Sequence, residues 1–420
     1  MAKILVYEMY PISWEQACVE NSHANALQMM TEHLKRVKEL SVDYVWLAPI
    51  YPSPRWDHGY DIAEYCSVDD RFGSLSDLDD FITAAHDHGL KVLMDLVLNH
   101  TSVMHEWFDP CHEHGVHAHP EYYCWSSKDR KDWHNLFDGG PAWKKDKKRK
   151  QYYLHLFHQY QPDLNWFPDG GLSIQLVHEF RRIIEFWTIV HDVDGFRIDV
   201  PQAINKNLDS DSCDLTELLS GNRALKVLNA VFDIPSAIAS KPFLIMECID
   251  PSHGELAERY TKESPVDYVM DVNPNAPSRM GGAELDYFIN AAARTSGAML
   301  ALESHDSQRL PSLISELSAK MILCRIFRSD IEAVCLYQGQ ELGLKNPTER
   351  ELPHSLMLRL DTRSAGWNAA GKSRGYIRAH TRANTRIAFP LDEYAYQEGD
   401  HDSCLNFVKR EIKRWKTSNP

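Results

Sequence analysis

The chain has 420 residues, with 45 Lys and Arg against 60 Asp and Glu, and its formal net charge is −15. Hydrophobic residues make up 43% of the chain, which is enough for a large folded core and excludes a mainly disordered protein. The acidic balance argues against nucleic acid or an anionic membrane as the main partner, and the sequence has no apolar run long enough to span a bilayer.

The cysteine pattern indicates a reducing compartment. The nine cysteines are scattered along the chain, and none forms a C-x-x-C motif. A chain of this length does not need disulfide bonds to fold. The first residues read at once as a strand and have no signal-peptide core. We therefore expect a cytoplasmic protein with free thiols.

Short apolar runs rich in β-formers alternate with longer amphipathic stretches, a pattern typical of βα units around a parallel sheet. The expected strands are Ile4–Tyr10, Asp43–Ala48, Lys91–Leu98, Gly195–Val200, Phe243–Glu247, Val266–Asp271, Ala298–Glu303 and Ala333–Tyr337. The expected helices include Ala24–Leu40, Leu78–His88, Ser173–Val190, Ser312–Phe327 and Cys404–Trp415.

Eight such units predict an α/β fold, a (β/α)8 TIM barrel with an inserted small B domain after the third strand. Residues 1–100 would form the first part of the barrel, 101–168 the insertion and 169–420 the second part. The insertion is rich in His, Trp and Tyr. Its basic run Lys144–Lys150 is expected to be a solvated turn between two strands. A second irregular stretch is expected at about Gly343–Gly399.

The chemistry of a TIM barrel gathers at the carboxyl ends of its strands. Here those ends carry Asp95, Asn99 and His100, then Arg197 and Asp199, then Glu247, and finally His305 and Asp306. Several carboxylates at one mouth, without metal-ligand spacing, suit glycoside hydrolysis, in which one carboxylate attacks carbon and one carboxylic acid protonates the leaving oxygen. The alternative is a scaffold of structural ion pairs.

Six local sequences occur in the order and at the intervals of one known family. They are Trp56-Asp57-His58-Gly59-Tyr60-Asp61, Asp95-Leu96-Val97-Leu98-Asn99-His100, Tyr152–Phe157 with Gln161–Asn165, Gly195-Phe196-Arg197-Ile198-Asp199, Met246-Glu247 and Ser304-His305-Asp306. With them the chain resembles the α-amylase superfamily (glycoside hydrolase family 13), and most closely its oligo-1,6-glucosidase and α-glucosidase branch. The resemblance extends from about Tyr7 to Gly343.

The resemblance implies a role for each matching residue. Asp199 would be the nucleophile, Glu247 the general acid/base and Asp306 the third carboxylate, which binds sugar hydroxyls. The substrate-binding residues would be Asp57, Tyr60, His100, Phe137, Arg197, His305 and Arg363. Asp57 resembles the residue that binds the terminal 4-hydroxyl in exo-acting members. Its arginine partner stays open between Arg363 and Arg359.

The chain also departs from the family. The loop expected at Ser13–Ala26 lacks the aspartate-rich pattern that binds Ca²⁺ or Mg²⁺ in many relatives, so we expect no metal and no cofactor. The His-rich stretch Cys111–His119 resembles a metal site, but no partner residues are evident, and we expect it to be structural. The C-terminal β-sandwich that is usual in the family is expected to be absent.

One residue bears on the linkage specificity. Val200 follows the expected nucleophile, and valine there is common in α-1,6-acting members of the branch, so we expect a short oligosaccharide substrate with an α-1,6 leaning. An α-glucosyl transferase or sucrose isomerase would use the same residues and is the alternative. A non-catalytic amylase-like partner subunit is more remote, because the three carboxylates are kept and no membrane helix is evident. A homo-oligomer is left open.

Overall fold

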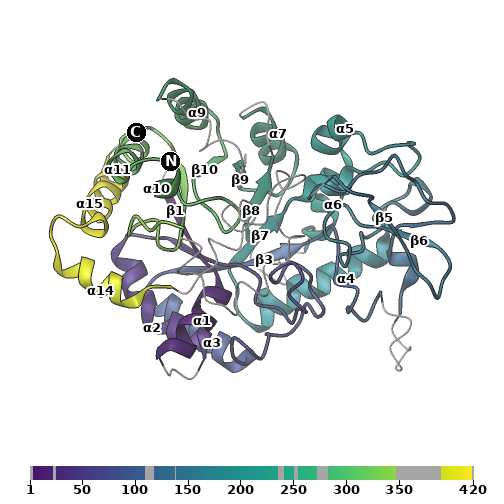
Figure 1. The fold of residues 1–420 in the computed structure, drawn as a ribbon, viewed down its shortest axis with the longest axis horizontal. Coiled ribbons are helices and arrows are strands. Elements are labelled where there is room, and N and C mark those ends of the chain that lie inside the picture. Colours follow the sequence, from purple (N-terminus) through teal and green to yellow (C-terminus); the bar gives the residue numbers. More distant parts are fainter. Residues whose placement is uncertain are drawn as a thin grey trace.

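The computed structural model describes residues 3–21, 25–108, 118–137, 139–234, 241–249, 254–271, 282–346 and 389–418. Eight parallel strands close into a barrel in the order β1-β11-β10-β9-β8-β7-β3-β2, and the helices surround them (Figure 1). The expected (β/α)8 barrel is confirmed. Its strands are β1 (Ile4–Met9), β2 (Tyr44–Leu47), β3 (Lys91–Val97), β7 (Gly195–Asp199), β8 (Phe243–Cys248), β9 (Tyr268–Asp271), β10 (Ala298–Ala301) and β11 (Ala333–Tyr337).

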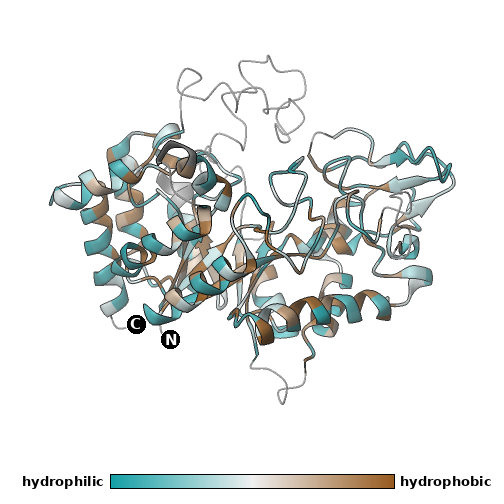
Figure 2. Ribbon diagram, turned by 90° about the horizontal axis from the view of Figure 1, so that it is seen from below, coloured by the Kyte–Doolittle hydropathy of each residue, from teal (hydrophilic) through white to brown (hydrophobic). Residues whose placement is uncertain are grey.

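Helices connect successive strands on the outside of the barrel. In chain order they are α1 (Pro11–Asn21), α2 (Ala26–Glu39), α3 (Leu75–Asp87), α4 (Ile174–Glu185), α5 (Leu215–Ser220), α6 (Arg223–Val231), α7 (Glu255–Glu263), α9 (Gly282–Arg294), α10 (Leu310–Leu313), α11 (Glu316–Ile326), α14 (Leu391–Gly399) and α15 (Cys404–Thr417). Brown and teal residues alternate along these helices (Figure 2), and the buried residues of α2, α4 and α6 are almost all apolar. This two-sided pattern is what a helix packed on one side of a sheet requires.

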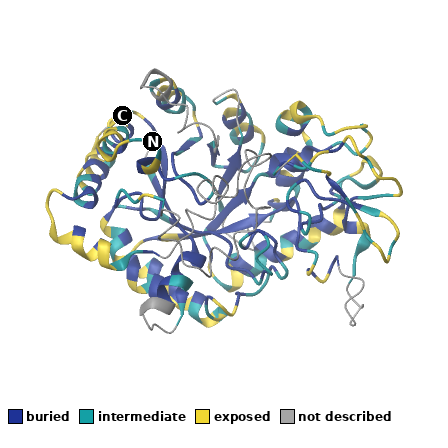
Figure 3. Ribbon diagram, viewed as in Figure 1, coloured by how far each residue is buried: buried dark blue, intermediate teal, exposed yellow. Residues whose placement is uncertain are grey.

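The core has two main parts, which lie inside the barrel and between the barrel and its helices. The barrel interior is filled by apolar side chains from every barrel strand except β7. They are Val6, Trp46, Leu93, Ile245, Tyr268, Met270, Met299, Ala333 and Cys335. Most residues of the barrel strands are accordingly buried, whereas the outer faces of the helices are exposed (Figure 3). The barrel is therefore a packed core that presents functional groups only at its ends.

The first residue of β7, Gly195, allows a close approach between the backbones of β7 and β8. A Cβ atom placed on Gly195 would lie 1.9 Å from the carbonyl oxygen of Phe243 on β8. Only glycine lets the two backbones approach this closely. The contact sets the register in which Arg197 pairs with Ile245, and so fixes the height of the arginine in the barrel.

The segment between β3 and α4 carries a separate antiparallel sheet, in the order β4-β6-β5. These strands are β4 (Trp125–Ser126), β5 (Trp143–Lys145) and β6 (Tyr152–Leu154). They lie at the opposite end of the molecule from the termini (Figure 1). The basic run Lys144–Lys150 begins in β5 and continues through the turn that leads to β6. The limits 101–168 of this segment as a domain stay a prediction.

Three sequence predictions are wrong in detail. The stretch after β1 is not a loop at first, because Trp14, Ala17 and Cys18 are buried on one face of helix α1. The helix expected at Ser312–Phe327 is broken in two, since the Ser315 side chain caps α11 by accepting a hydrogen bond from the backbone N–H of Ser318. Part of the irregular stretch Gly343–Gly399 is helix α14, and residues 347–388 lie outside the described part.

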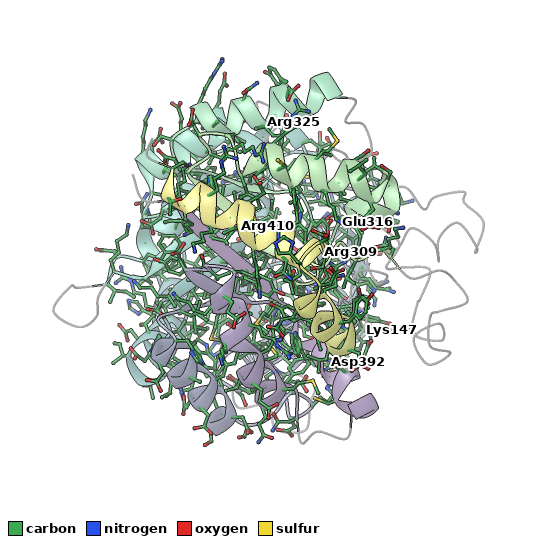
Figure 4. The ribbon with its side chains drawn as sticks, turned by 90° about the vertical axis from the view of Figure 1, so that its left-hand side faces the viewer. Lys147, Arg309, Glu316, Arg325, Asp392 and Arg410 are labelled. Carbon is green, nitrogen blue, oxygen red and sulfur yellow. The ribbon has the colours of Figure 1, made fainter. Side chains whose placement is uncertain are left out.

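The last two helices close the barrel next to its first strand. Figure 4 shows α14 and α15 in front of the barrel, with α11 beside α15. The Lys416 ammonium binds both the Lys3 carbonyl oxygen and the Asp43 carboxylate, and so joins α15 to the start of β1 and β2. Within the described ranges, the structure contains no helix that is both long and apolar enough to cross a membrane.

Candidate active site

Arg197 is the hub of the charged groups at the carboxyl end of the barrel. Its side chain is only 1% exposed. Nη1 lies 2.7 Å from Oδ1 of Asp95 and 2.8 Å from Oδ1 of Asp199, and Nη2 binds the Glu247 carboxylate. One guanidinium thus holds three carboxylates from three neighbouring strands, β3, β7 and β8. Arginine suits this position because its fork of donors stays charged when buried.

Aromatic side chains form the floor beneath Arg197. The guanidinium carbon lies 4.8 Å from the ring centre of Trp46 and 5.6 Å from that of Tyr60. Trp46 Nε1 and the Tyr60 hydroxyl both donate to Oδ2 of Asp95, at 3.1 and 3.0 Å. Trp46 belongs to the barrel core, and its indole also orients Asp95. Asp95 therefore has both oxygens bound and serves to position the arginine.

The two carboxylates that flank Arg197 are expected to differ in protonation. Burial raises the pKa of Glu247 to about 8, with the charges of Asp199, Asp306 and Asp95 acting in the same direction and Arg197 opposing them. Burial also raises the pKa of Asp199, and Arg197 again opposes the shift. Several like charges in one enclosed space cannot all ionise. A protonated Glu247 beside an ionised Asp199 is the arrangement that acid–nucleophile chemistry needs.

His305 and Asp306 approach from the loop after β10. His305 Nδ1 lies 2.6 Å from Oε1 of Glu8, and its Nε2 lies 3.4 Å from Oδ1 of Asp306. The imidazole is stacked on Tyr60, with ring centres 5.1 Å apart and planes 14° apart. The Asp306 side chain is about one-third exposed, so it is accessible to solvent at this end of the barrel.

The loop after β2 presents Asp57. Its turn is held by Asp61, whose carboxylate accepts hydrogen bonds from the backbone N–H groups of Trp56 and Asp57 at 2.9 and 3.0 Å. Gln161 of the inserted segment donates through Nε2 to Oδ2 of Asp57 at 2.9 Å. The charge of Asp57 acts on Asp199. The inserted segment, through Gln161, and the barrel loop, through Asp61, therefore both position the Asp57 carboxylate at the site.

His100 and Phe137 line the side that the insertion covers. His100 is buried, and its burial lowers its pKa to about 4, with Asp163 and Asp57 opposing the shift. Its ring centre lies 5.2 Å from that of Phe157, which in turn lies 5.5 Å from Phe137. The two phenylalanines form an apolar wall beside a neutral imidazole, whose ring can donate or accept a hydrogen bond.

Lys206 connects three segments behind His100. Its ammonium lies 2.7 Å from Oδ1 of Asn99, 3.2 Å from Oδ2 of Asp163 and 3.4 Å from the carbonyl oxygen of Ala203. Asp163 also pairs through its backbone with His100. This buried ion pair joins the end of β3, the end of the insertion and the turn after Asp199.

The structure thus brings together nearly all of the residues expected at the site. Around Arg197 lie Asp57, Tyr60, His100, Phe137, Asp199, Glu247, His305 and Asp306. Arg363 and its rival Arg359 lie outside the described residues, as does most of the stretch Cys111–His119. Within the described part of the chain, no three His, Cys, Asp or Glu side chains are placed to hold a metal ion.

Sequence reasoning missed three residues of the site, namely Glu8, Gln161 and Lys206. Glu8 is a single charge in an apolar strand, which is itself an available signal, because a carboxylate inside a barrel strand is costly. Gln161 lies in a motif that was recognised, but its partner Asp57 is 104 residues away. Lys206 carries no local pattern.

Comparison with known proteins gives the site a family context. The family profile described as "Alpha amylase, catalytic domain" matches residues 8–396. The chain is 30% identical over 404 residues to an α-glucosidase of Schizosaccharomyces pombe, which covers 86% of this chain and 68% of that protein. It is 37% identical over 206 residues to an oligo-1,6-glucosidase of Bacillus cereus, covering 48% of this chain and 35% of that protein. The matched region thus spans about one third to two thirds of these relatives.

Solved structures agree on the fold. A trehalose-6-phosphate hydrolase of Bacillus licheniformis superposes with a TM-score of 0.80 at 26% identity. The match covers 99% of this chain and 84% of that one. The barrel and its insertion are therefore shared over almost the whole length compared.

Proposed function

Because the chain belongs to the α-amylase family of glycoside hydrolases, we propose that it is a retaining hydrolase of α-glucosidic bonds in short oligosaccharides. The observation that carries the proposal is that two terminal nitrogens of the Arg197 guanidinium hold Asp199 and Glu247. Two carboxyl groups about 5–5.5 Å apart characterise retaining glycosidases, and sharing one guanidinium keeps the pair close.

In the proposed reaction Asp199 attacks the anomeric carbon of the glucosyl unit. Arg197 keeps this carboxylate ionised and aimed. Glu247 gives its proton to the leaving oxygen, so that a covalent β-glucosyl ester forms on Asp199. The ionised Glu247 then takes a proton from water, which attacks the same carbon and releases glucose in the α-configuration.

The surrounding residues would bind the sugar ring. Asp306 and His305 face the ring hydroxyls from the loop after β10, and His100 faces them from the end of β3. Tyr60 supplies an aromatic face, and the wall of Phe137 and Phe157 supplies apolar contact. Hydrogen bonds that shorten as the ring flattens in the transition state are the ones that accelerate the step.

Asp57 supports an exo-acting pocket. A carboxylate has several acceptor positions, so Asp57 can accept hydrogen bonds both from Gln161 and from a terminal sugar hydroxyl. In the proposed enzyme it binds the 4-hydroxyl of the non-reducing end. Arg363 stays the proposed partner of Asp57, with Arg359 as the alternative, and both lie outside the described residues.

The α-1,6 leaning is proposed on Val200. Its φ of 24° and ψ of 59° place a β-branched residue in the left-handed region directly after Asp199. Such a conformation is costly for valine, by about 1–3 kcal/mol, and it fixes the Cβ branches beside the nucleophile. A fixed bulk there restricts how the leaving sugar approaches. The resemblance of this chain to an oligo-1,6-glucosidase points the same way.

A reducing cytoplasm is the proposed location. No cysteine within the described residues is assigned to a disulfide, which suits a compartment where disulfides do not persist. A small oligosaccharide is the proposed partner, and self-association stays open.

The proposal is tested by product analysis on isomaltose, maltose, trehalose and sucrose in parallel, with Asp199→Asn as the inactive control. Glucose released from isomaltose well ahead of maltose is the expected result. New disaccharides or longer products would show a glucosyl transferase or a sucrose isomerase instead. If no glucoside is turned over, the proposal fails.

A further inference from the structure

The barrel strand β1 places a carboxylate among otherwise apolar interior positions. Glu8 follows Val6 on the inward face of β1, and its exposed fraction is 0%. A buried carboxylate costs several kcal/mol unless it is paired. Its Oε1 lies 2.6 Å from His305 Nδ1, whereas its Oε2 has no hydrogen-bond partner among the described residues. The hydrogen bond to His305 therefore compensates for the burial of the Glu8 carboxylate.

The imidazole of His305 has little freedom to turn. Its ring lies against Tyr60, with centres 5.1 Å apart, against Tyr10 at 5.5 Å and against Trp46 at 5.9 Å. With Nδ1 on Glu8, Nε2 lies 3.4 Å from Oδ1 of Asp306, a charge contact that does not have hydrogen-bond geometry. Glu8, His305 and Asp306 thus form a line from the barrel interior to the edge of the site.

The charges around Glu8 come from four other elements. Arg197 on β7 favours the ionised carboxylate, while Asp95 on β3 and Asp306 after β10 disfavour it. Cys335 on β11 also lies within electrostatic reach. Burial is the largest effect and raises the pKa of Glu8 well above its usual range. A Glu8–His305 pair with no net charge is therefore favoured over one that carries an extra negative charge.

That uncharged pair fixes the outer nitrogen of His305. The shared proton lies either on Oε1, so that Glu8 donates to Nδ1, or on Nδ1, so that imidazolium donates to Glu8. In both forms Nε2 carries a hydrogen, because only the inner proton changes place. The hydrogen-bond partner of one imidazole nitrogen commonly decides the state of the other in this way.

We propose that Glu8 is a positioning residue that keeps a proton on Nε2 of His305, so that His305 donates to Asp306 or to a sugar hydroxyl. Only the effect of Glu8 on catalysis rests on the proposed function. The protonation state itself can be measured without any substrate, so the failure of one proposal is distinguishable from the failure of the other.

The direct test is NMR of the full chain labelled with ¹⁵N-histidine, with the His305 signals assigned from a His305→Gln variant. In the wild-type protein at pH 7, Nε2 should carry a hydrogen. Leucine at position 8 cannot bond Nδ1. In Glu8→Leu the His305 signals should therefore change, and Nε2 should carry a hydrogen in only a fraction of the molecules. A wild-type Nε2 without a hydrogen, or a state unchanged by Glu8→Leu, would overturn the inference.

Kinetics provide the second readout. For a substrate that the wild type hydrolyses, Glu8→Leu should lower kcat/KM by about 100-fold, within the range of losing a positioned proton donor, and should alter its pH profile. Glu8→Gln keeps a hydrogen bond to Nδ1 and should restore most of this loss. Val6→Ala, on the same face of β1, is the packing control and should lower Tm without altering the pH profile. Equal losses in Glu8→Gln and Glu8→Leu would contradict the positioning role. If Glu8→Leu fails to fold, the wild-type spectrum still decides.

Discussion

Nη1 of Arg197 lies 2.8 Å from Oδ1 of Asp199, two residues further along β7. Residues two apart on a strand share a face, so a single strand both supplies the proposed nucleophile and holds it. The same guanidinium reaches Glu247 on the neighbouring strand β8. The two carboxylates are thus aligned by the register of β7 and β8, which Gly195 makes possible.

Glu247→Gln tests the general acid. Activity of the wild type should fall as the pH rises through about 8, because a raised pKa keeps Glu247 protonated below that value and ionised above it. The variant cannot titrate, so its alkaline limb should disappear. Its kcat/KM should fall by about 10²–10⁴-fold on substrates with poor leaving groups, and much less on activated aryl glucosides. Equal losses on both substrate types would contradict the acid role.

Val200→Ala tests the linkage preference. Removing the β-branch beside Asp199 should lower the ratio of kcat/KM for isomaltose to that for maltose by about 10-fold, the order that one or two methyl groups provide. The matched control is Val193→Ala, a buried valine before the other end of β7. An unchanged ratio in Val200→Ala would show that specificity is set elsewhere.

Lys206→Met tests the link between the insertion and the barrel. The variant leaves the Asp163 carboxylate buried without its cation, which typically costs about 3–5 kcal/mol. Urea unfolding should show this loss in the free energy of unfolding. The double variant Lys206→Met with Asp163→Asn should recover part of it, because no charge then stays buried. A single variant as stable as the wild type would rule out this link.

His33 predicts part of the acid sensitivity. This residue of α2 is enclosed by Trp14, Phe389 and Tyr394, and both of its ring nitrogens lack hydrogen-bond partners among the described residues. Burial lowers its pKa to about 3. Since the unfolded chain binds a proton near pH 6.5, stability is present above that pH and is lost as the pH falls toward 3.

His33→Phe should therefore lose less stability between pH 7 and pH 4 than the wild type. Each unit of pKa difference is worth about 1.4 kcal/mol. The check is the free energy of unfolding at the two pH values, with His88→Gln as the control for an exposed histidine at the end of α3. Identical pH dependence in His33→Phe and the wild type would refute the assignment.

Much of this architecture can be read from the sequence because buried parallel strands are apolar runs with polar groups at their carboxyl ends. This pattern located all eight strands and the residues Asp199, Glu247 and Asp306. It could not reveal the hydrogen bond from Gln161 to Asp57 or the bond from Glu8 to His305, because these join residues far apart in the chain. The α14 helix was missed because it follows a long stretch without apolar periodicity.

The central claim is that Asp199 and Glu247 form a retaining pair. It is tested most directly by following the anomers of glucose by NMR in the first minutes of hydrolysis of an α-glucoside that the protein cleaves, with Asp199→Asn in parallel. The account predicts that α-glucose appears first and then equilibrates with the β-anomer, and that Asp199→Asn is slower by about 10⁴-fold or more. Initial release of β-glucose, or near-normal hydrolysis by Asp199→Asn, would contradict it.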